Sequence, residues 1–412
     1  MKNKRFFVQH VLPFFISIAA LIVLVNSPFK KAFIRYELDY KDRKWDPALH
    51  ERCIRSCNDY LPNEWALRNA FHFGTPMVVI GSSEMTHFES QAIPFNFFTD
   101  KKIPCIGVGH AGNQLHSILV QLAAFHQDLD KVKLTIILSP GWFEGGATNG
   151  TPLETFLEYA DEHNLYYIWY DKTIPKEIKD HIYDYVVTHF KEIDSPSSIL
   201  RAIYYSRSSE KNKLLRPFYA PFTGLYEYYI GIKWNEMVEN KYVDRPFEMT
   251  KLAKDTAGVT AEDIQINNWD SLYTTAVKKF SNESSNNPYA IENSYYNEYM
   301  KGKGLRVLKS TDANNNMEFN DLKMLLLLLN KFHCKPLFVM QGLNPLVYQN
   351  LNELDPILKK VKEEILKNGF EFLDLHTSDA SKYVRGILND YQHMGEAGWY
   401  KVDEKMYNYF IK

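Results

Sequence analysis

Residues 76–84 read Pro-Met-Val-Val-Ile-Gly-Ser-Ser-Glu, and this stretch decides the fold. A short, uninterrupted apolar run that stops at a glycine is typical of a strand buried on both faces of a parallel sheet. Open parallel sheets bind ligands at the carboxyl ends of their strands, where the two serines stand. The stretch therefore predicts a first strand over residues 76–80 and a candidate site directly after it.

Further apolar runs and helical spacings continue this pattern along the chain. Short apolar runs predict four more strands, and apolar residues at intervals of three and four predict helices between them. The predicted elements are strands 76–80, 102–109, 133–138, 336–340 and 370–374, and helices 114–127, 321–332 and 356–368. Strands that alternate with helices predict an α/β fold with a parallel sheet flanked by helices.

Two regions differ from this pattern. Residues from about 145 to 315 lack strong strand signals and contain helical stretches such as Lys176–Glu192, so they predict a helical insertion. Residues 31–73 are charged and aromatic at helical spacing, and they predict a helical stalk. The domain organisation expected is a stalk followed by one α/β domain over 74–412 that carries the insertion.

Residues 6–29 contain no charged side chain except His10 when it is protonated. As a helix, these 24 positions span about 36 Å, which exceeds a hydrocarbon core of about 30 Å. Positive charges in residues 2–5 favour a cytoplasmic N-terminus. No A-x-A-like cleavage site follows, which favours an uncleaved anchor over a signal peptide. We therefore expect residues 1–30 to form a single-pass transmembrane anchor in the cell membrane. The rest of the chain is expected to be extracytoplasmic.

The composition excludes several classes of protein. Hydrophobic residues at 45% and charged residues at 24% fit neither a disordered chain nor a polytopic membrane protein. A net charge of −2 gives no broad footprint for nucleic acid. Four cysteines are too few for a disulfide scaffold, and Cys53 and Cys57 lack the partners of a zinc site. No H-E-x-x-H, Walker or dinucleotide motif occurs, so neither a metal nor another cofactor is expected.

Serine, glycine, aspartate and histidine stand at the ends of the predicted strands and near the C-terminus. A serine after a buried strand, glycine amides, and an Asp-x-x-His together supply a nucleophile, an oxyanion site and an oriented base. Taken alone, Gly-Ser-Ser is more often a turn with a helix N-cap, and Asp-x-x-His is usually a surface pair. Their occurrence in order favours one site. The candidates are Ser82, Ser83, Gly109, Gly112, Gly141, Asp390 and His393.

The order and content of these segments resemble the SGNH (GDSL-like) hydrolase superfamily, in which a serine block opens the domain and Asp-x-x-His closes it. More closely, the chain resembles the DltD family, membrane-anchored proteins of teichoic acid D-alanylation. The resemblance runs from the N-terminal anchor to about residue 407 and is looser in the middle third. Its segments are IGSSEMTHF, VGHAGNQLHSILVQLA, ILSPGWFEGG, NSYYNEYM, MEFNDLKMLLLLLNKFHCKPLFVMQGLNP and NDYQHMGEAGWYKVD.

The resemblance implies roles for three of the candidates and an alternative for one. Ser83 would be the nucleophile, because the Gly-x-Ser of the first block places its serine third, and Ser82 is the alternative. His393 would be the base that takes the serine proton. Asp390 would hold the imidazole in the tautomer that this transfer needs.

The resemblance also implies substrate-stabilising positions. The amides of Ser83 and of Gly109 or Gly112 would stabilise the oxyanion. Relatives usually have glutamine where this chain has Gly141, so either the Gly141 backbone replaces a side-chain donor or the acceptor differs. Asn344 matches the asparagine of a Pro-Val-Asn-Gly segment in relatives and is a further candidate, although a tryptophan found nearby in relatives is missing here.

The function that the resemblance implies is acyl transfer. A D-alanyl group, delivered by a membrane O-acyltransferase of the DltB type, would pass through an acyl-Ser83 intermediate to teichoic acid or lipoteichoic acid beside the membrane lipid. Two alternatives stay open. The same residues would serve an esterase acting on an acylated cell-wall glycopolymer, or the chain would be a non-catalytic partner of the acyltransferase. No nucleic acid partner is expected.

Overall fold

The computed structural model describes residues 11–26, 70–71, 74, 76–86, 90–146, 150–160, 162–207, 266, 268–309 and 311–412. The chain divides into two compact units. The larger, Lys44–Tyr159 with Phe247–Lys412, contains the sheet, and the smaller, Met1–Arg43 with Ala160–Pro246, contains helices.

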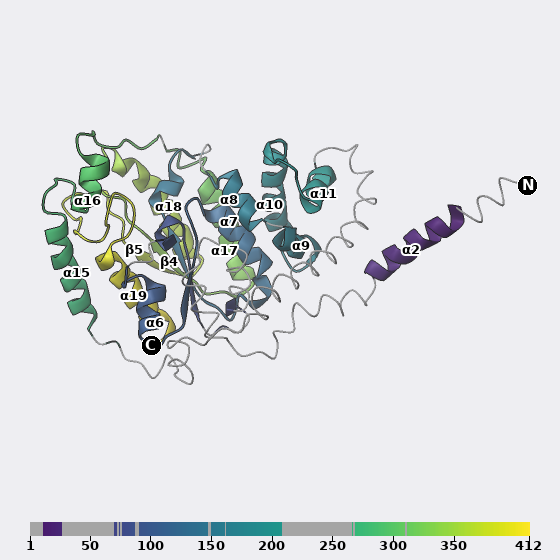
Figure 1. Cartoon of the computed structure of the whole chain (residues 1–412), viewed down its shortest axis with the longest axis horizontal. Helices are drawn as coiled ribbons and strands as arrows, with labels where there is room; N and C mark the ends of the chain where they lie inside the picture. The colour runs from purple at the N-terminus through teal and green to yellow at the C-terminus, as the bar shows by residue number, and fades with distance from the viewer. Residues whose placement is uncertain are drawn as a thin grey trace, which may run out of the picture. The chain divides into compact units, whose positions relative to one another are not determined.

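The larger unit is built on five parallel strands in the order β2-β1-β3-β4-β5. Figure 1 labels β4 and β5 of this sheet. Within the sheet, Val78 of β1 lies opposite Ile106 of β2 on one side and Leu134 of β3 on the other. The parallel α/β fold predicted from the sequence is therefore confirmed. The strands are β1 Met77–Ile80, β2 Cys105–Val108, β3 Lys133–Leu138, β4 Leu337–Met340 and β5 Glu371–Asp374.

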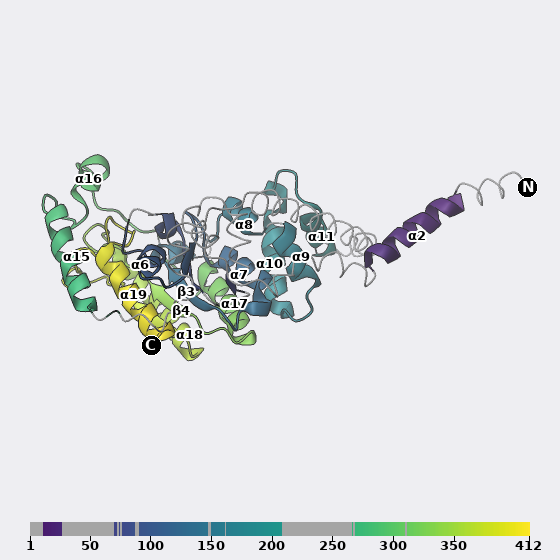
Figure 2. The same ribbon diagram turned by 60° about the horizontal axis from the view of Figure 1, so that its bottom comes forward.

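Helices cover both faces of this sheet. Helix α6 packs on β2, and α19 packs on both α6 and β4, which places these two helices on one face, with α15 against α19. Helices α7, α17 and α18 lie on the opposite face (Figure 2). Their bounds are α6 Pro94–Asp100, α7 Leu115–Ala124, α15 Trp269–Glu283, α17 Met317–Lys331, α18 Asp355–Lys367 and α19 Glu396–Phe410.

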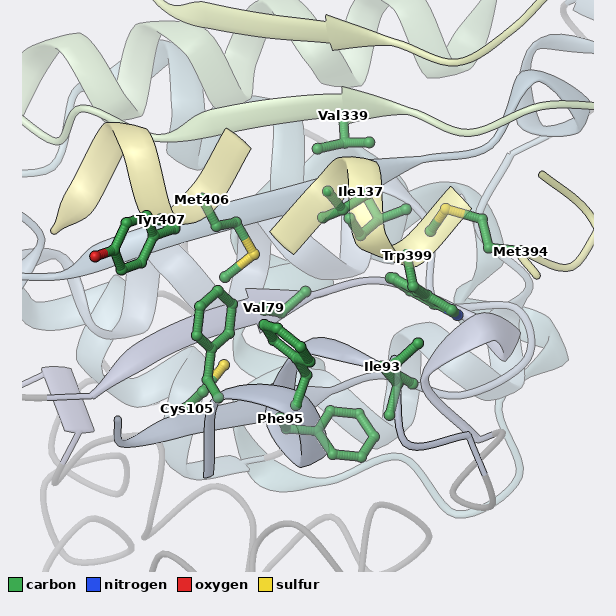
Figure 3. Close-up of a cluster of buried hydrophobic side chains, with 14 of the residues drawn as sticks. Val79, Ile93, Phe95, Cys105, Ile137, Val339, Met394, Trp399, Met406 and Tyr407 are labelled. Carbon is green, nitrogen blue, oxygen red and sulfur yellow. The ribbon is translucent and has the colours of Figure 1, made fainter. Parts of the chain in front are cut away.

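A buried hydrophobic cluster joins the sheet to α6 and α19 (Figure 3). Alternate strand residues such as Val79 and Val339 face this cluster, as the period of two along a strand requires. Trp399 and Met406 of α19 meet them and are almost completely buried. Large buried aromatic side chains dominate the stability of such cores. This packing fixes the start of α19, and with it the loop that carries Asp390 and His393.

The smaller unit is helical in its described part. Its helices include α9 Glu162–Tyr170, α10 Lys176–His189 and α11 Ser198–Arg207. Helix α10 and the short turn Phe190–Glu192 agree with the helical stretch predicted over 176–192. No strand occurs in the described residues between 145 and 315, which include α8 Leu153–Tyr159 of the larger unit. The predicted domain boundaries stay predictions.

Helix α2, Leu12–Asn26, lies inside the predicted membrane segment, and Phe14, Phe15 and Ile16 on it are exposed. Among the residues that the structure describes, no helix combines the length and the apolar character needed to cross a bilayer. Residues 6–10 and 27–29, most of the predicted stalk, and both Cys53 and Cys57 lie outside the described residues.

Candidate active site

Ser83 stands in a tight turn directly after β1. The chain passes through Gly81 and Ser82 and enters a 3-10 turn, Ser83–Thr86. The Gly81 amide donates to the carbonyl of Val108 (3.0 Å), which continues the β1–β2 pairing to the end of the strand. A Cβ at Gly81 would lie 2.4 Å from Oε1 of Glu84, so any larger residue here would displace that carboxyl group. Local packing thus presents Ser83 at the carboxyl edge of the sheet, as predicted.

His393 and Asp390 reach this edge from the loop before α19. The Oγ of Ser83 lies 3.0 Å from Nε2 of His393. On the other side of the ring, Nδ1 lies 2.7 Å from Oδ2 of Asp390. The second carboxylate oxygen of Asp390 accepts the backbone amides of Gln392 (2.7 Å) and His393 (2.8 Å). The structure therefore brings these three predicted residues into one chain of hydrogen bonds.

The electrostatics of the pair suit a base held by an ionised carboxylate. Burial opposes ionisation of Asp390, but its hydrogen bond to His393, the histidine charge and two backbone amides outweigh burial and lower its pKa. Burial would lower the pKa of His393, yet Asp390, with a smaller contribution from Glu84, raises it. The carboxylate therefore stays charged and strengthens the imidazole as a proton acceptor.

Ser82, the alternative nucleophile, makes its side-chain hydrogen bond to a backbone carbonyl and not to His393. Its Oγ donates to the carbonyl of His110 (3.2 Å), and the residue is buried. Its backbone amide donates to the side chain of Glu84 (2.7 Å). Of the two serines, Ser83 is the one hydrogen-bonded to His393.

Glu84 is a site residue that the sequence did not single out. It is only 1% exposed, and its Oε1 accepts the amide of Ser82 at 2.7 Å. Its Oε2 has no hydrogen-bond partner among the described residues. Burial raises the pKa of the Glu84 carboxyl, against the lowering effects of backbone amides and of His393. The one available signal was Gly81, whose missing Cβ makes space for this carboxyl group.

The two glycines after β2 occupy different surroundings. Gly109 has φ +148°, and a Cβ there would lie 2.2 Å from the carbonyl oxygen of Gly81, so its backbone lies against the nucleophile turn. The buried side chain of Asn113 donates to the same Gly81 oxygen (2.8 Å). Gly112, with φ +88°, instead packs against Thr155 of α8. Of the two predicted oxyanion glycines, Gly109 is the one packed on the turn after β1.

Gly141 lies in a 3-10 turn, Pro140–Phe143, that follows β3, the neighbour of β1 in the sheet. The nearest atom to a Cβ at Gly141 would be Oγ of Ser139 at 3.7 Å, so this position has room for a side chain. The turn after β3 thus ends at the same edge of the sheet as the turn that carries Ser83.

Asn344 is fully buried, and its side chain bonds within the protein. Its Nδ2 donates to the carbonyl of Tyr289 (2.9 Å), and its Oδ1 accepts the amide of Leu346 (2.9 Å). Its backbone amide donates to the carbonyl of Tyr391 (3.0 Å), which follows Asp390 directly. This geometry fits a role in holding the loop of Asp390 and His393, while the predicted substrate contact stays a prediction.

An alcohol hydrogen-bonded to an imidazole, itself hydrogen-bonded to a buried carboxylate at the edge of a parallel sheet, is typical of serine-dependent hydrolases and acyltransferases. A family model described as DltD protein matches residues 60–411, and the chain belongs to this family. The resemblance seen in the sequence is thereby confirmed.

Individual relatives agree with this assignment. The chain is 24% identical over 338 residues to Protein DltD of Staphylococcus aureus, covering 80% of this chain and 79% of that protein. It is 23% identical over 345 residues to Protein DltD of Lacticaseibacillus rhamnosus, covering 79% and 75%. It is also 23% identical over 426 residues to Protein DltD of Bacillus subtilis, covering 99% and 98%. The similarity therefore extends over most of each chain.

Proposed function

We propose that this chain acts in the D-alanylation of teichoic acid and transfers the D-alanyl group through an ester on Ser83. The observation that carries the proposal is the hydrogen-bonded series from Oγ of Ser83 through His393 to Asp390, with distances of 3.0 and 2.7 Å. Such a series gives a neutral alcohol a base within reach and holds that base in the required tautomer. Membership of the DltD family supplies the substrate class.

The transfer takes place in two steps at the same serine. First, Oγ of Ser83 attacks the carbonyl carbon of a D-alanyl ester or thioester, and Nε2 of His393 takes the serine proton. The bond between the acyl carbon and the donor breaks, and the donor leaves with the proton from His393. Next, a hydroxyl of the acceptor polymer gives its proton to His393 and attacks the acyl carbon. The bond between the acyl carbon and Oγ of Ser83 then breaks, and Oγ takes the proton back from His393, which releases the D-alanyl polymer ester and restores Ser83.

Backbone amides would stabilise the negative oxygen that forms in each step. The amides of Ser83 and Gly109 are the proposed donors, supported by the close packing of Gly109 on the Gly81 carbonyl. Gly141 is a third candidate, because its turn follows the neighbouring strand β3. A positioned polymer hydroxyl must compete with water for the acyl group, so the position of the acceptor decides between transfer and hydrolysis.

Membrane attachment and partners belong to the same proposal. The uncharged residues 6–29 would anchor the chain with its N-terminus in the cytoplasm and the site outside, close to lipid-linked polymer. The apolar side chains exposed on α2, Phe14 and Phe15 among them, support a lipid contact for this helix. A membrane O-acyltransferase of the DltB type would supply the D-alanyl group, and teichoic acid or lipoteichoic acid would accept it.

The test is the D-alanine ester content of teichoic acid in a deletion strain complemented with variants. Ser83→Ala and His393→Ala should each reduce the ester content to that of the deletion strain. Ser82→Ala is the matched control, because it removes a neighbouring hydroxyl that contacts the His110 carbonyl, and it should restore D-alanylation. If both Ser83→Ala and His393→Ala restore the esters, the chain is a non-catalytic partner and the proposal is wrong.

A second measurement separates transfer from hydrolysis. The purified full-length chain, in detergent, is incubated with D-alanylated polymer, and free D-alanine is measured. Transfer predicts little release of free D-alanine and exchange of label between polymer chains. Rapid release that depends on Ser83, without exchange, would identify an esterase and contradict the transferase.

A further inference from the structure

A cluster of tyrosines borders the loop that carries Asp390 and His393. We call it the tyrosine cluster; it packs around Ile291, Met300 and Val347. The rings of Tyr295 and Tyr348 lie 6.1 and 6.2 Å from that of Tyr391. Such separations are within the range of favourable aromatic pairs. Its members are Tyr289, Tyr295, Tyr296, Tyr348 and Tyr391.

Part of the cluster comes from the NSYYNEYM segment, which the proposed transfer does not use. This segment forms one short helical turn, Asn293–Tyr295, followed by a π-helical turn, Tyr296–Met300. Turns of the π type are rare and occur frequently at functional sites. Tyr299 on this turn is 48% exposed, and its ring lies 4.9 Å from that of Tyr295. Through Tyr295, the tyrosine cluster beside the site loop thus contacts Tyr299, which is exposed to solvent.

Arg306 lies flat against this cluster. Its guanidinium carbon is 3.7 Å from the centre of the Tyr391 ring. The backbone amide of Arg306 donates to Val347 (2.9 Å), and the amide of Gln349 donates to the Arg306 carbonyl (2.9 Å), which fixes the segment beside Tyr348. A guanidinium whose face contacts a ring keeps its N–H groups in its own plane, free to bind an anion at its edge.

The cations around Arg306 form no side-chain ion pair among the described residues, although the backbone amide of Lys309 donates to the carboxylate of Glu144. Residues 301–309, Lys-Gly-Lys-Gly-Leu-Arg-Val-Leu-Lys, contain four basic residues and no acid, and we call this stretch the basic segment. Its four cations form no ion pair with any residue that the structure describes. Arg207, by contrast, is bound by Asp180 and Asp184, each at 2.7 Å. No carboxylate among the described residues therefore neutralises the basic segment, which favours binding of an external anion.

The basic segment is also open to a large partner. Arg306 and the three lysines of this stretch are exposed. A Cβ at Gly302 or Gly304 would meet no atom within 4 Å, so the backbone there borders open space. These features fit an extended ligand rather than a small ion enclosed in a pocket.

We infer that Arg306, the basic segment and the tyrosine cluster form a binding site for the phosphodiester backbone of the acceptor polymer. A phosphodiester offers two oxygens that match the guanidinium fork, and its repetition along a polymer matches a row of cations. The polyol or sugar between phosphates would contact the exposed ring of Tyr299 and the half-buried rings of the tyrosine cluster. This inference rests on the proposed function, and it would explain how a hydroxyl is positioned ahead of water. Arg306 contacts Tyr391, which follows Asp390 directly, so a phosphate on Arg306 would be held next to the loop that carries the base.

The test is binding of a short synthetic glycerol phosphate oligomer to the full-length chain in detergent. Arg306→Gln should weaken binding about tenfold, the value expected for loss of a hydrogen bond to a charged group. The affinity of Arg306→Lys for the oligomer should lie between those of wild type and Arg306→Gln, because lysine keeps the charge but lacks the forked guanidinium group. Lys303→Met, on an exposed stretch where misfolding is not expected, should weaken binding a few-fold and make its salt dependence shallower.

Lys401→Met is the matched control. Lys401 lies on α19 with its Nζ 4.3 Å from the centre of the Tyr273 ring and 3.7 Å from Oε2 of Glu404, so this variant removes one charge, one cation–π contact and one surface ion pair elsewhere. It should bind the oligomer like wild type. The inference is overturned if the Arg306 variants bind like wild type, if Lys401→Met weakens binding as much as Arg306→Gln, or if a neutral polyol oligomer binds equally well.

Two further measurements complete the test. The first distinguishes the polymer from lipid as the ligand, and the second distinguishes failure of the polymer site from failure of the proposed transfer. Vesicles of phosphatidylglycerol should not displace the oligomer, and full displacement would assign the site to lipid and overturn the inference. Labelling of Ser83 by a fluorophosphonate is measured on the same wild-type preparation. If Ser83 does not react while binding still depends on Arg306, the proposed transfer fails and the polymer site stands. If Ser83 reacts but Arg306 is irrelevant, only the polymer site fails.

Discussion

The Oγ of Ser83 lies 3.0 Å from Nε2 of His393, although the two residues are 310 positions apart in the chain. Two structural features produce this contact. The turn after β1 presents the serine, with Gly81 leaving space for Glu84. The burial of α19 against the sheet sets the position of the histidine loop. A substitution that alters either feature should therefore change the reaction rate without changing the reacting atoms.

The pH dependence of Ser83 reactivity should follow the protonation of His393. Below its pKa the imidazole carries a proton and cannot accept the one from Ser83, so reactivity rises as the pH rises through this pKa. Because Asp390 raises the pKa of His393, the rise should occur above the pH expected for an ordinary histidine. The measurement is the rate of fluorophosphonate labelling across a pH series.

Asp390→Asn removes the group that raises this pKa and leaves burial, which lowers it. The rise should move to lower pH, and the plateau rate should fall by roughly 10⁴-fold, the size of this effect in serine proteases. His333→Asn, at an exposed histidine outside the site, should leave the profile unchanged. An Asp390→Asn profile that coincides with wild type would show that Asp390 does not act on His393.

Glu84 should make the stability of the fold depend on pH. Its pKa is raised by burial above the ordinary 4.5, so the native state binds more protons than the unfolded state between the two values. The free energy of unfolding should therefore fall as the pH rises through this window. Glu84→Gln keeps an oxygen for the Ser82 amide and cannot ionise, so its stability should decline less steeply.

Glu84→Ala distinguishes the hydrogen bond from the charge. It leaves the buried Ser82 amide without its acceptor, which should cost about 1–3 kcal/mol at every pH. Urea unfolding of the three proteins at several pH values tests both statements. Parallel pH curves for wild type and Glu84→Gln would contradict ionisation of this group.

Most of the sheet could be predicted from the sequence because most strands are short apolar runs, and β1, β2 and β3 are followed directly by a glycine or a serine. The third predicted strand, 133–138, coincides with β3. Helices α6 and α19 were not predicted. Aromatic and charged residues interrupt the apolar spacing of α19, and α6 is only seven residues long. Their burial depends on contacts with the finished sheet, which no local pattern contains.

Parts of the site differ in the same way. Strand ends and the Asp-x-x-His spacing, which are visible in one dimension, made Ser82, Ser83, Asp390 and His393 candidates. The choice of Ser83 over Ser82 came from the family resemblance. Glu84 was missed because an acid after a serine normally faces solvent, and only the packing around Gly81 turns it inward. The contact of Arg306 with Tyr391 joins residues from separate loops, and no spacing in the sequence indicates it.

Gly81→Ala should reduce catalysis while the protein still folds. The new Cβ would lie 2.4 Å from Oε1 of Glu84, so the carboxyl group must move away from the Ser82 amide and disturb the turn that holds Ser83. We expect the rate of Ser83 labelling to fall at least tenfold, which corresponds to about 1.4 kcal/mol in the barrier.

Gly342→Ala is the matched control for Gly81→Ala. It also follows a buried strand, but its Cβ would meet neighbours only at 3.5 Å and beyond, which is ordinary contact. This variant should label like wild type. Equal labelling rates for Gly81→Ala and wild type would mean that the Glu84 contact does not position the nucleophile.

Trp399→Ala should be among the most destabilising single changes in the larger unit. Trp399 is 1% exposed and fills the space between α19, α6 and the sheet (Figure 3). Removing a buried aromatic side chain leaves a cavity, at a cost of about 3–5 kcal/mol. Leu366→Ala, on α18 and 50% exposed, is the control and should cost less than about 0.5 kcal/mol. Urea midpoints measure both changes. Because α19 holds the loop of His393, labelling of Ser83 in Trp399→Ala should be lost at a lower urea concentration than in wild type. This loss should coincide with unfolding of the sheet. If Ser83 still reacts after α19 has unfolded, this helix does not hold the site together.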